Sequence, residues 1–238
     1  MKRWGHMAKT FTKIGKEITI AVKQGGPDVV GNSRLRALMA EARSENMPKD
    51  NVEKAIKRAL EKNQGDFKEV VFEGYGPHGI AYLVETATDN NTRTVANVRS
   101  YFTKCGGSLG TSGSVSFMFD HKCVFRIKYQ EGMDIDELQL ALCDCDDDPE
   151  VFIEEQEDKD ENITKNVVIY GAYESYGAIQ KYIEDNGYEL VSGGFERIPN
   201  VELKDVTPEQ RETLDKLTGL LEDDDDVTNV YSTLKPEE

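Results

Sequence analysis

Three amphipathic segments open the chain. Apolar residues of the first, over residues 11–22, recur with the 3.6-residue period of a helix, and a Gly-Gly-Pro sequence at 25–27 ends it. The second begins at Asn32, a natural capping residue, and the third begins at Pro48, which suits the first turn of a helix. Short helices with brief connections pack together. The pattern therefore predicts a three-helix bundle within residues 1–66.

The apolar period changes after this segment. Strand-like runs over 70–75 and 80–85 flank a Gly-Pro-His-Gly turn. A helix is predicted over 91–105, and alternating apolar residues over 115–119 predict a strand, followed by a second strand over 123–127. This mixture of helices and strands indicates an α+β fold.

Residues 130–202 alternate between the two periods. The pattern predicts, in order, a helix over 135–142, strands over 151–155 and 163–170, a helix over 173–186 and a strand over 188–198. Together with one preceding strand, this order matches the split β-α-β arrangement of ferredoxin-like domains.

A capping box at 207–210 predicts one more helix, which buries Leu214, Leu217 and Leu221. The acidic run at 223–226 ends it, and a closing strand is predicted over 227–234. Carboxylates are unfavourable at the negative end of a helix dipole. We therefore expect the acidic run to have a tertiary partner.

Charge is distributed unevenly along the chain, which carries −16 at pH 7. Residues 1–66 hold 14 Lys and Arg against 8 Asp and Glu, a net of +6, whereas residues 67–238 hold 15 against 37, a net of −22. A basic segment joined to an acidic remainder favours a nucleic-acid-binding module, because the remainder repels a polyanion and leaves one surface to dock.

Cationic side chains recur along one side of each predicted N-terminal helix. Such rows can neutralise phosphates and release their counterions. Most charge on helix surfaces is merely solvated or ion-paired, but the net excess in this segment favours binding. The candidate nucleic-acid-binding residues are Lys9, Lys13, Lys16, Lys23, Arg34, Arg36, Arg43, Lys49, Lys54, Lys57 and Arg58.

A glycine–serine stretch over 106–114 could hold phosphate on its backbone amides. Phosphate-binding loops of this kind lead into a helix and usually carry a lysine. Here the stretch follows a predicted helix and leads into a predicted strand, without the lysine. A helix stop with a tightly packed turn is the better interpretation.

An acidic run nearly fits a calcium loop, with Asp144, Asp146, Asp148 and Glu155 at positions 1, 3, 5 and 12. The sixth position, which requires glycine, is Pro149. We interpret this run as a helix end and hairpin, and we expect no metal site.

The remaining composition gives no support to catalysis. The three histidines and four cysteines form no metal-binding or nucleophile motif, so we expect no enzyme activity, no cofactor and no small-molecule substrate. Irregular cysteine spacing also argues against a disulfide framework, and we expect neither a secretory signal nor a membrane span, because no apolar run follows the first charged residues or approaches the length of a span. We expect a cytoplasmic protein.

The sequence resembles the YebC/PmpR family of probable transcriptional regulatory proteins, which includes the mitochondrial translational activator of cytochrome oxidase subunit one. The resemblance covers nearly the whole chain, although similar proteins carry a longer basic stretch before residue 11. It rests on Phe-Thr-Lys at 11–13, Asn-Ser-Arg-Leu-Arg at 32–36, Asn-Met-Pro-Lys-Asp-Asn at 46–51, Gly-Tyr-Gly-Pro at 74–77, Gly-Ser-Leu-Gly at 107–110 and Asp-Asp-Val-Thr-Asn-Val-Tyr at 225–231.

The resemblance implies three domains. They are a basic helical bundle over 1–66, an α+β domain over 67–129 and 203–238, and a ferredoxin-like domain over 130–202 inserted into the second. It also implies a DNA-binding transcriptional regulator. Two alternatives stay open on the sequence, namely a ribosome-associated translation factor that binds ribosomal RNA, and a scaffold whose acidic domains bind other proteins.

Overall fold

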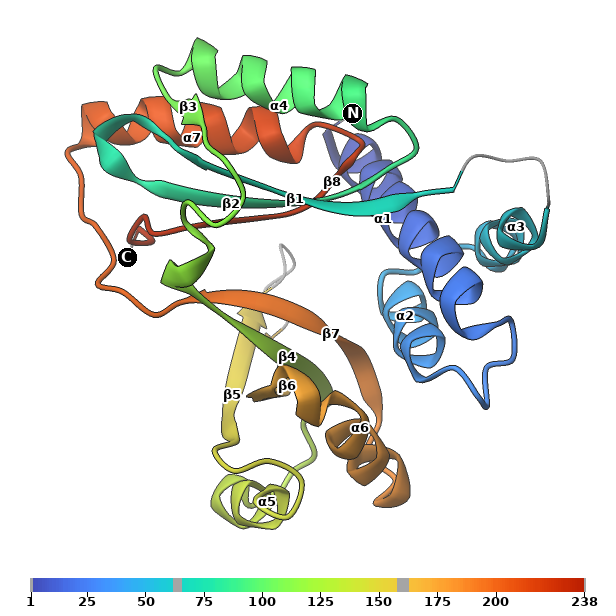
Figure 1. Ribbon diagram of the computed structural model, residues 1–238. Helices are drawn as coiled ribbons and strands as arrows, with labels where there is room; N and C mark the ends of the chain where they lie inside the picture. The colour runs from blue at the N-terminus through green and yellow to red at the C-terminus, as the bar shows by residue number, and fades with distance from the viewer. Residues whose placement is uncertain (1, 62–65, 158–162, 238) are drawn as a thin grey trace. The chain divides into compact units, whose positions relative to one another are not determined.

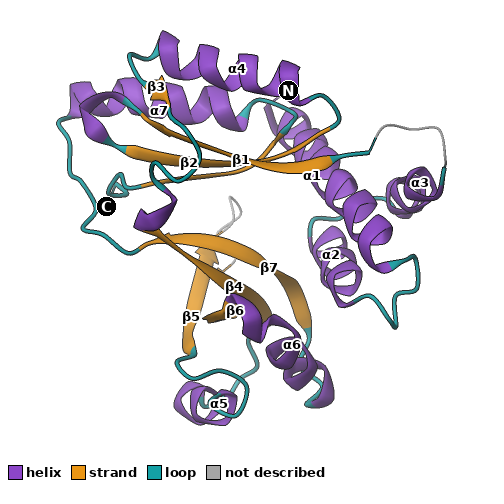
Figure 2. Ribbon diagram, viewed as in Figure 1, coloured by secondary structure: helices purple, strands orange, loops and turns teal. Residues whose placement is uncertain are grey.

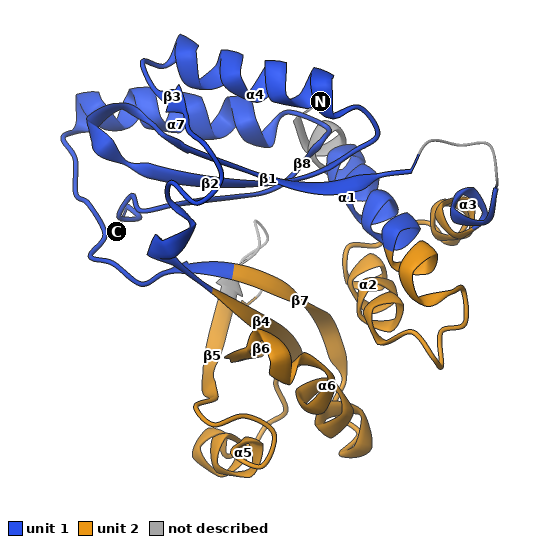
Figure 3. Ribbon diagram, viewed as in Figure 1, with its two compact units in different colours: residues 1–20, 57–120, 197–238 blue, residues 21–56, 121–196 orange. Residues whose placement is uncertain are grey.

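The computed structural model describes residues 2–61, 66–157 and 163–237. It confirms a mixed α+β fold with N-terminal helices and two antiparallel sheets. The chain divides into two compact units (Figure 3): residues 1–20, 57–120 and 197–238 form the first, and residues 21–56 and 121–196 form the second.

The three N-terminal helices are α1 (Lys2–Gly25), α2 (Ser33–Ser44) and α3 (Lys49–Leu60) (Figure 1). The predicted cap is confirmed, since the Asn32 side chain accepts a 3.0 Å hydrogen bond from the Leu35 amide. Its Nδ2 also donates to the Ala21 and Gly26 carbonyl oxygens, which ties the start of α2 to the end of α1. The first helix begins well before residue 11, earlier than its apolar stripe predicted.

The first sheet has the order β3-β1-β2-β8, with every neighbouring pair antiparallel. Two helices cover one face, where Tyr82, Phe102 and Leu217 are buried in the core. The predicted capping box at Thr207 and Gln210 is confirmed at the start of the second of these helices. The elements are β1 (Lys68–Tyr75), β2 (Ala81–Thr88), α4 (Asn91–Lys104), β3 (Ser108–Leu109), α7 (Pro208–Glu222) and β8 (Val227–Ser232).

The second sheet has the order β5-β6-β4-β7, and its chain order of strand, helix, two strands, helix and strand is that of a ferredoxin-like fold. Two helices pack on one face around Phe125, Ile169 and Ile179. The elements are β4 (Phe119–Lys128), α5 (Ile135–Leu142), β5 (Glu150–Glu157), β6 (Ile163–Ala172), α6 (Tyr176–Asp185) and β7 (Leu190–Pro199), as Figure 2 shows.

Two local predictions are wrong. Residues Ser116–Met118 form a 3₁₀ turn, and Phe117 is 66% exposed rather than half-buried in a strand. The strand predicted over 123–127 is part of β4, which lies in the second sheet as the strand that precedes residues 130–202. The apolar period of the third segment also predicts that Leu60 is buried, but Leu60 in α3 is 59% exposed, whereas Ala55 of the same helix is buried. The division into three domains stays a prediction.

Across the described residues, no helix pairs sufficient length with the apolar character needed to cross a bilayer.

Candidate nucleic-acid interface

Much of the cationic row on α1 contacts the acidic segment at 222–226. The Lys16 ammonium donates to the Asp226 carboxylate (2.8 Å) and to the carbonyl oxygens of Asp225 (2.7 Å) and Ala87 (3.1 Å), so its three protons are used. Lys9 forms an ion pair with Asp223, and Lys13 donates to the Glu222 carbonyl oxygen at 3.4 Å. Burial lowers the pKa of Lys13.

Asp226 is the centre of this contact and is only 5% exposed. Besides Lys16, its carboxylate accepts hydrogen bonds from Arg93 Nη2 (2.6 Å) and from the Thr94 hydroxyl (2.8 Å). Burial alone would raise its pKa, but the hydrogen bonds from Lys16, Arg93 and Thr94 outweigh it and lower the pKa of Asp226 to about 2. The expected tertiary partner of the acidic run is therefore confirmed.

The arginines of α2 also have partners within the protein. Arg36 makes a two-pronged ion pair with Glu184 (2.8 and 3.1 Å) and donates to two backbone carbonyl oxygens, those of Val29 and Val30. Arg34 donates to the Gln24 side chain at 3.1 Å, and the exposed Arg43 donates through Nε to the carbonyl oxygen of Met39 in its own helix. Arg36 is thus held in place by the fold.

The cations of α3 are different. Lys49, Lys54 and Lys57 are exposed, and the structure pairs none of them with an acidic side chain in the part of the chain that it describes. Arg58 stacks on the Phe67 ring, 4.3 Å from its centroid, and Lys16 lies 5.3 Å from the same centroid. Lys23, in the last turn of α1, is exposed as well. The structure thus leaves the lysines of α3 open to an external polyanion.

The end of the glycine–serine stretch and the two residues after it bind an internal carboxylate and not a phosphate. Glu73, 5% exposed, accepts hydrogen bonds from the amides of Gly113 (2.7 Å), Val115 (2.8 Å) and Ser116 (2.8 Å). Burial raises its pKa, but these bonds dominate and lower it. Val115 and Ser116 therefore cannot use these amides in a strand ladder, which explains the 3₁₀ turn.

The start of the same stretch is a helix stop, as interpreted from the sequence. Gly106 ends α4 at a positive φ of 77°. A Cβ at Gly107 would lie 2.5 Å from the Tyr75 carbonyl oxygen, so only glycine fits there.

The acidic run near residue 146 is likewise used within the fold. Asp146 accepts hydrogen bonds from the amides of Asp148 (3.0 Å) and Ala172 (2.8 Å) and is 7% exposed. Within residues 2–61, 66–157 and 163–237, no group of His, Cys, Asp or Glu side chains is arranged to hold a metal ion.

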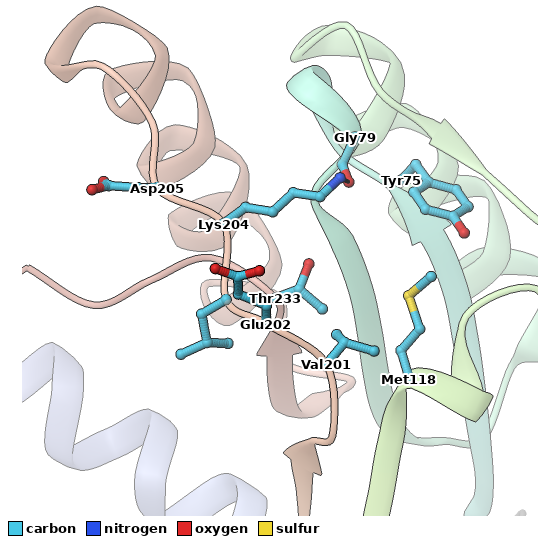
Figure 4. Close-up of a pocket in the computed structure, with 9 residues that line it drawn as sticks. Tyr75, Gly79, Met118, Val201, Glu202, Lys204, Asp205 and Thr233 are labelled. Atoms are coloured by element: carbon cyan, nitrogen blue, oxygen red, sulfur yellow. Dashed lines mark hydrogen bonds between the residues drawn. The ribbon is translucent and has the colours of Figure 1, made fainter.

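An open groove of about 590 Å³ lies within the first unit (Figure 4). Tyr75, Met118 and Val201 supply apolar walls. The Lys204 ammonium donates to the Gly79 carbonyl oxygen at 2.7 Å, and the Thr233 hydroxyl accepts from the Ala81 amide at 3.0 Å. Both polar groups therefore make hydrogen bonds to the backbone of the fold. They are not arranged as a nucleophile with its general base.

The N-terminal segment and the remainder of the chain match the domains of one known family. Residues 1–62 match the description "TACO1/YebC protein N-terminal domain", and residues 67–234 match "TACO1/YebC second and third domain". The chain is 58% identical to proteins named "Probable transcriptional regulatory protein" from Parabacteroides distasonis and Bacteroides thetaiotaomicron, over 100% of this chain and 93% of each relative. That name describes a regulator and not an enzyme.

A solved structure is similar as well. The crystal structure of a conserved hypothetical protein from Aquifex aeolicus matches with a TM-score of 0.77 and 32% identity, over 97% of this chain and 91% of that chain.

Proposed function

The chain belongs to the TACO1/YebC family, and from this premise we propose that it is a DNA-binding transcriptional regulatory protein that contacts the nucleic-acid backbone through its basic N-terminal helices. The observation that carries the proposal is the set of exposed lysines on α3, Lys49, Lys54 and Lys57, which have no acidic partner among the described residues. Lysines free of internal partners can neutralise phosphates and release counterions.

The eleven candidate cations divide into three groups under this proposal. Lys9, Lys13, Lys16 and Arg36 contact groups of the protein itself, and we assign them to holding the fold. The α3 lysines make the principal phosphate contacts, with Lys23 and Arg43 as the exposed cations of α1 and α2. Arg34 and Arg58 contribute less, since one donates to Gln24 and the other stacks on Phe67.

The acidic remainder of the chain supports the same arrangement. Its net charge of −22 repels a polyanion, which leaves few surfaces on which one can dock. Such binding depends on backbone contacts and falls steeply as salt rises. The four free cysteines are in keeping with action in a reducing cytoplasm.

Fluorescence anisotropy with labelled duplex DNA, titrated between about 50 and 200 mM salt, tests the proposal. We expect affinity to fall with salt, and Lys54→Gln combined with Lys57→Gln to reduce the slope of log affinity against log salt by about two. Lys181→Gln with Lys216→Gln is the matched control, because both lysines are exposed on α6 and α7.

Affinity that stays flat as salt rises, or equal weakening by the control pair, would overturn the proposal. A duplex RNA of the same sequence is titrated in parallel. Tighter binding to RNA than to DNA at every salt concentration would replace transcription by the translational alternative.

A further inference from the structure

The longest stretch of the chain without an acidic residue lies outside the N-terminal helices. Asp and Glu make up 45 of the 238 residues, so a stretch of 30 would hold about six at the average frequency. Residues 90–119 hold none, between Asp89 and Asp120, and they include Arg93, Arg99 and Lys104. This stretch comprises α4 and the glycine–serine loop, residues 106–116, and it lies entirely in the first unit.

One face of α4 carries an uninterrupted exposed stripe, opposite the buried Val98 and Phe102. The stripe is about 16 Å long at the helical rise of 1.5 Å per residue. Arg99 makes no ion pair with any residue that the structure describes, and Lys104, also exposed, lies 5.8 Å from the Tyr101 ring centroid. The exposed residues that recur at helical spacing along the stripe are Thr92, Ala96, Arg99 and Thr103.

The acidic residue that follows α7 contacts α4 on the side away from this stripe. The exposed Asp89, just before α4, forms an ion pair with Arg93. Figure 2 shows α4 beside α7 on one face of the first sheet. Asp224, which follows α7, accepts hydrogen bonds from Asn97 (3.1 Å) and Tyr101 (2.9 Å). Asn97 and Tyr101 therefore separate this carboxylate from the exposed stripe.

The glycine–serine loop extends the acid-free surface. Gly110, Thr111, Ser112 and Gly113 are exposed. Glu73, whose carboxylate contacts the loop, is buried and already accepts three backbone amides. A Cβ at Gly106 or Gly113 would have nothing within 4 Å, so the backbone is open to close approach there.

We propose that the exposed stripe of α4 and the glycine–serine loop form a second contact surface for the phosphodiester backbone of nucleic acid. Arg99 on the stripe and Lys104 in the last turn of α4 supply the cations, and the hydroxyls of Thr111 and Ser112 supply hydrogen-bond donors of the kind that contact phosphate oxygens. A polyanion meets no carboxylate from this segment itself. The inference rests on the proposed function and adds a surface that the N-terminal helices do not include.

The test repeats the salt titration with Arg99→Gln combined with Lys104→Gln, on duplex DNA and duplex RNA probes. We expect the slope of log affinity against log salt to fall by about two, and the affinity to fall roughly tenfold at physiological salt. The Lys181→Gln and Lys216→Gln pair is again the control. Thr111→Asp with Ser112→Asp, at two exposed loop positions, should weaken binding with an unchanged circular dichroism spectrum.

The outcomes separate the two proposals. Unchanged affinity and slope in the Arg99 and Lys104 variant, with weakened binding in the Lys54 and Lys57 variant, would refute the second surface and leave the proposed function standing. Wild-type protein that binds neither probe at low salt would refute both. Weakening by both pairs, with the control unchanged, is the result that supports the second surface.

Discussion

Lys16 on α1 and Asp226 before β8 form a buried ion pair, with a 2.8 Å separation between Nζ and Oδ1 and side chains that are 11% and 6% exposed. The pair joins residues 210 positions apart in the sequence. Removal of one partner of a buried pair leaves the other charge desolvated without compensation, which costs far more than the loss of a surface ion pair.

Asp226→Asn should therefore lower the free energy of unfolding by about 3 to 5 kcal/mol. The substitution leaves Lys16 and Arg93 without their shared carboxylate. Urea unfolding followed by circular dichroism measures the change. Asp225→Asn is the matched control, because the Asp225 side chain is exposed. This substitution should change the free energy of unfolding by less than about 0.5 kcal/mol. Equal midpoints for wild type and Asp226→Asn would contradict the structural role.

Lowering the pH should remove the stabilisation that the Asp226 carboxylate provides, and it should do so within a narrow pH range. The pKa of Asp226 is about 2 in the folded protein, against 3.8 for an ordinary aspartate. The unfolded chain therefore takes up the proton first, so the stabilisation is complete above pH 3.8 and is lost as pH falls through 2. The difference in urea midpoint between wild type and Asp226→Asn should shrink across that range. A difference that stays constant down to pH 2 would argue against it.

Glu41 on α2 should make the protein less stable as pH rises, which is the opposite of the effect of Asp226. Burial, and then repulsion by Glu45, raise its pKa to about 7, and Arg126 opposes the shift. The unfolded chain releases this proton first, near pH 4.5, so stability falls as pH rises from 4.5 to 7.

Glu41→Gln removes the titration and should stabilise the protein at pH 8 by on the order of 3 kcal/mol, with little effect at pH 4. Thermal unfolding of both proteins at the two pH values measures this. A stability difference that is the same at pH 4 and pH 8 would show that Glu41 is not responsible.

Glu73→Gln should release the glycine–serine loop. The substituted amide group offers one acceptor oxygen where the carboxylate offers two, so some of the amides of Gly113, Val115 and Ser116 lose their partner. Hydrogen exchange at these amides should accelerate. The Gly110 amide is an internal control, because it donates to the Glu73 backbone oxygen, which the substitution retains. Unaltered exchange at all three loop amides would mean that the carboxylate does not hold the loop.

Local signals predicted local structure well. Asn32 and the Thr207 capping box specify helix starts through atoms within three residues, and both are confirmed. Likewise, the apolar stripe of Leu214, Leu217 and Leu221 is fully buried as the period indicates.

Distant partners could not be predicted from the same signals. Periodicity places Lys16 on the polar side of α1, but nothing near it indicates Asp226, and Arg93 and Glu73 were not recognised as structural anchors for the same reason. The misfit of four aspartates at a helix end was the one signal, and it indicated that a partner exists without identifying it. The acid-free stretch at 90–119, in contrast, is a property of the sequence alone, and a count of acidic residues in successive windows identifies it.

The order of strands along the chain has a consequence for synthesis on the ribosome. All four strands of the second sheet lie between Phe119 and Pro199, so that sheet can close while the last part of the chain is still being made. In the first sheet, Tyr82 on β2 pairs with Ser232 on β8, and the acidic anchor for α1 arrives only with Asp226. Helix α1 is synthesised first, but the ion pair of Lys16 can form only after Asp226 has been synthesised. Until then, the α1 lysines are as open to a polyanion as those of α3.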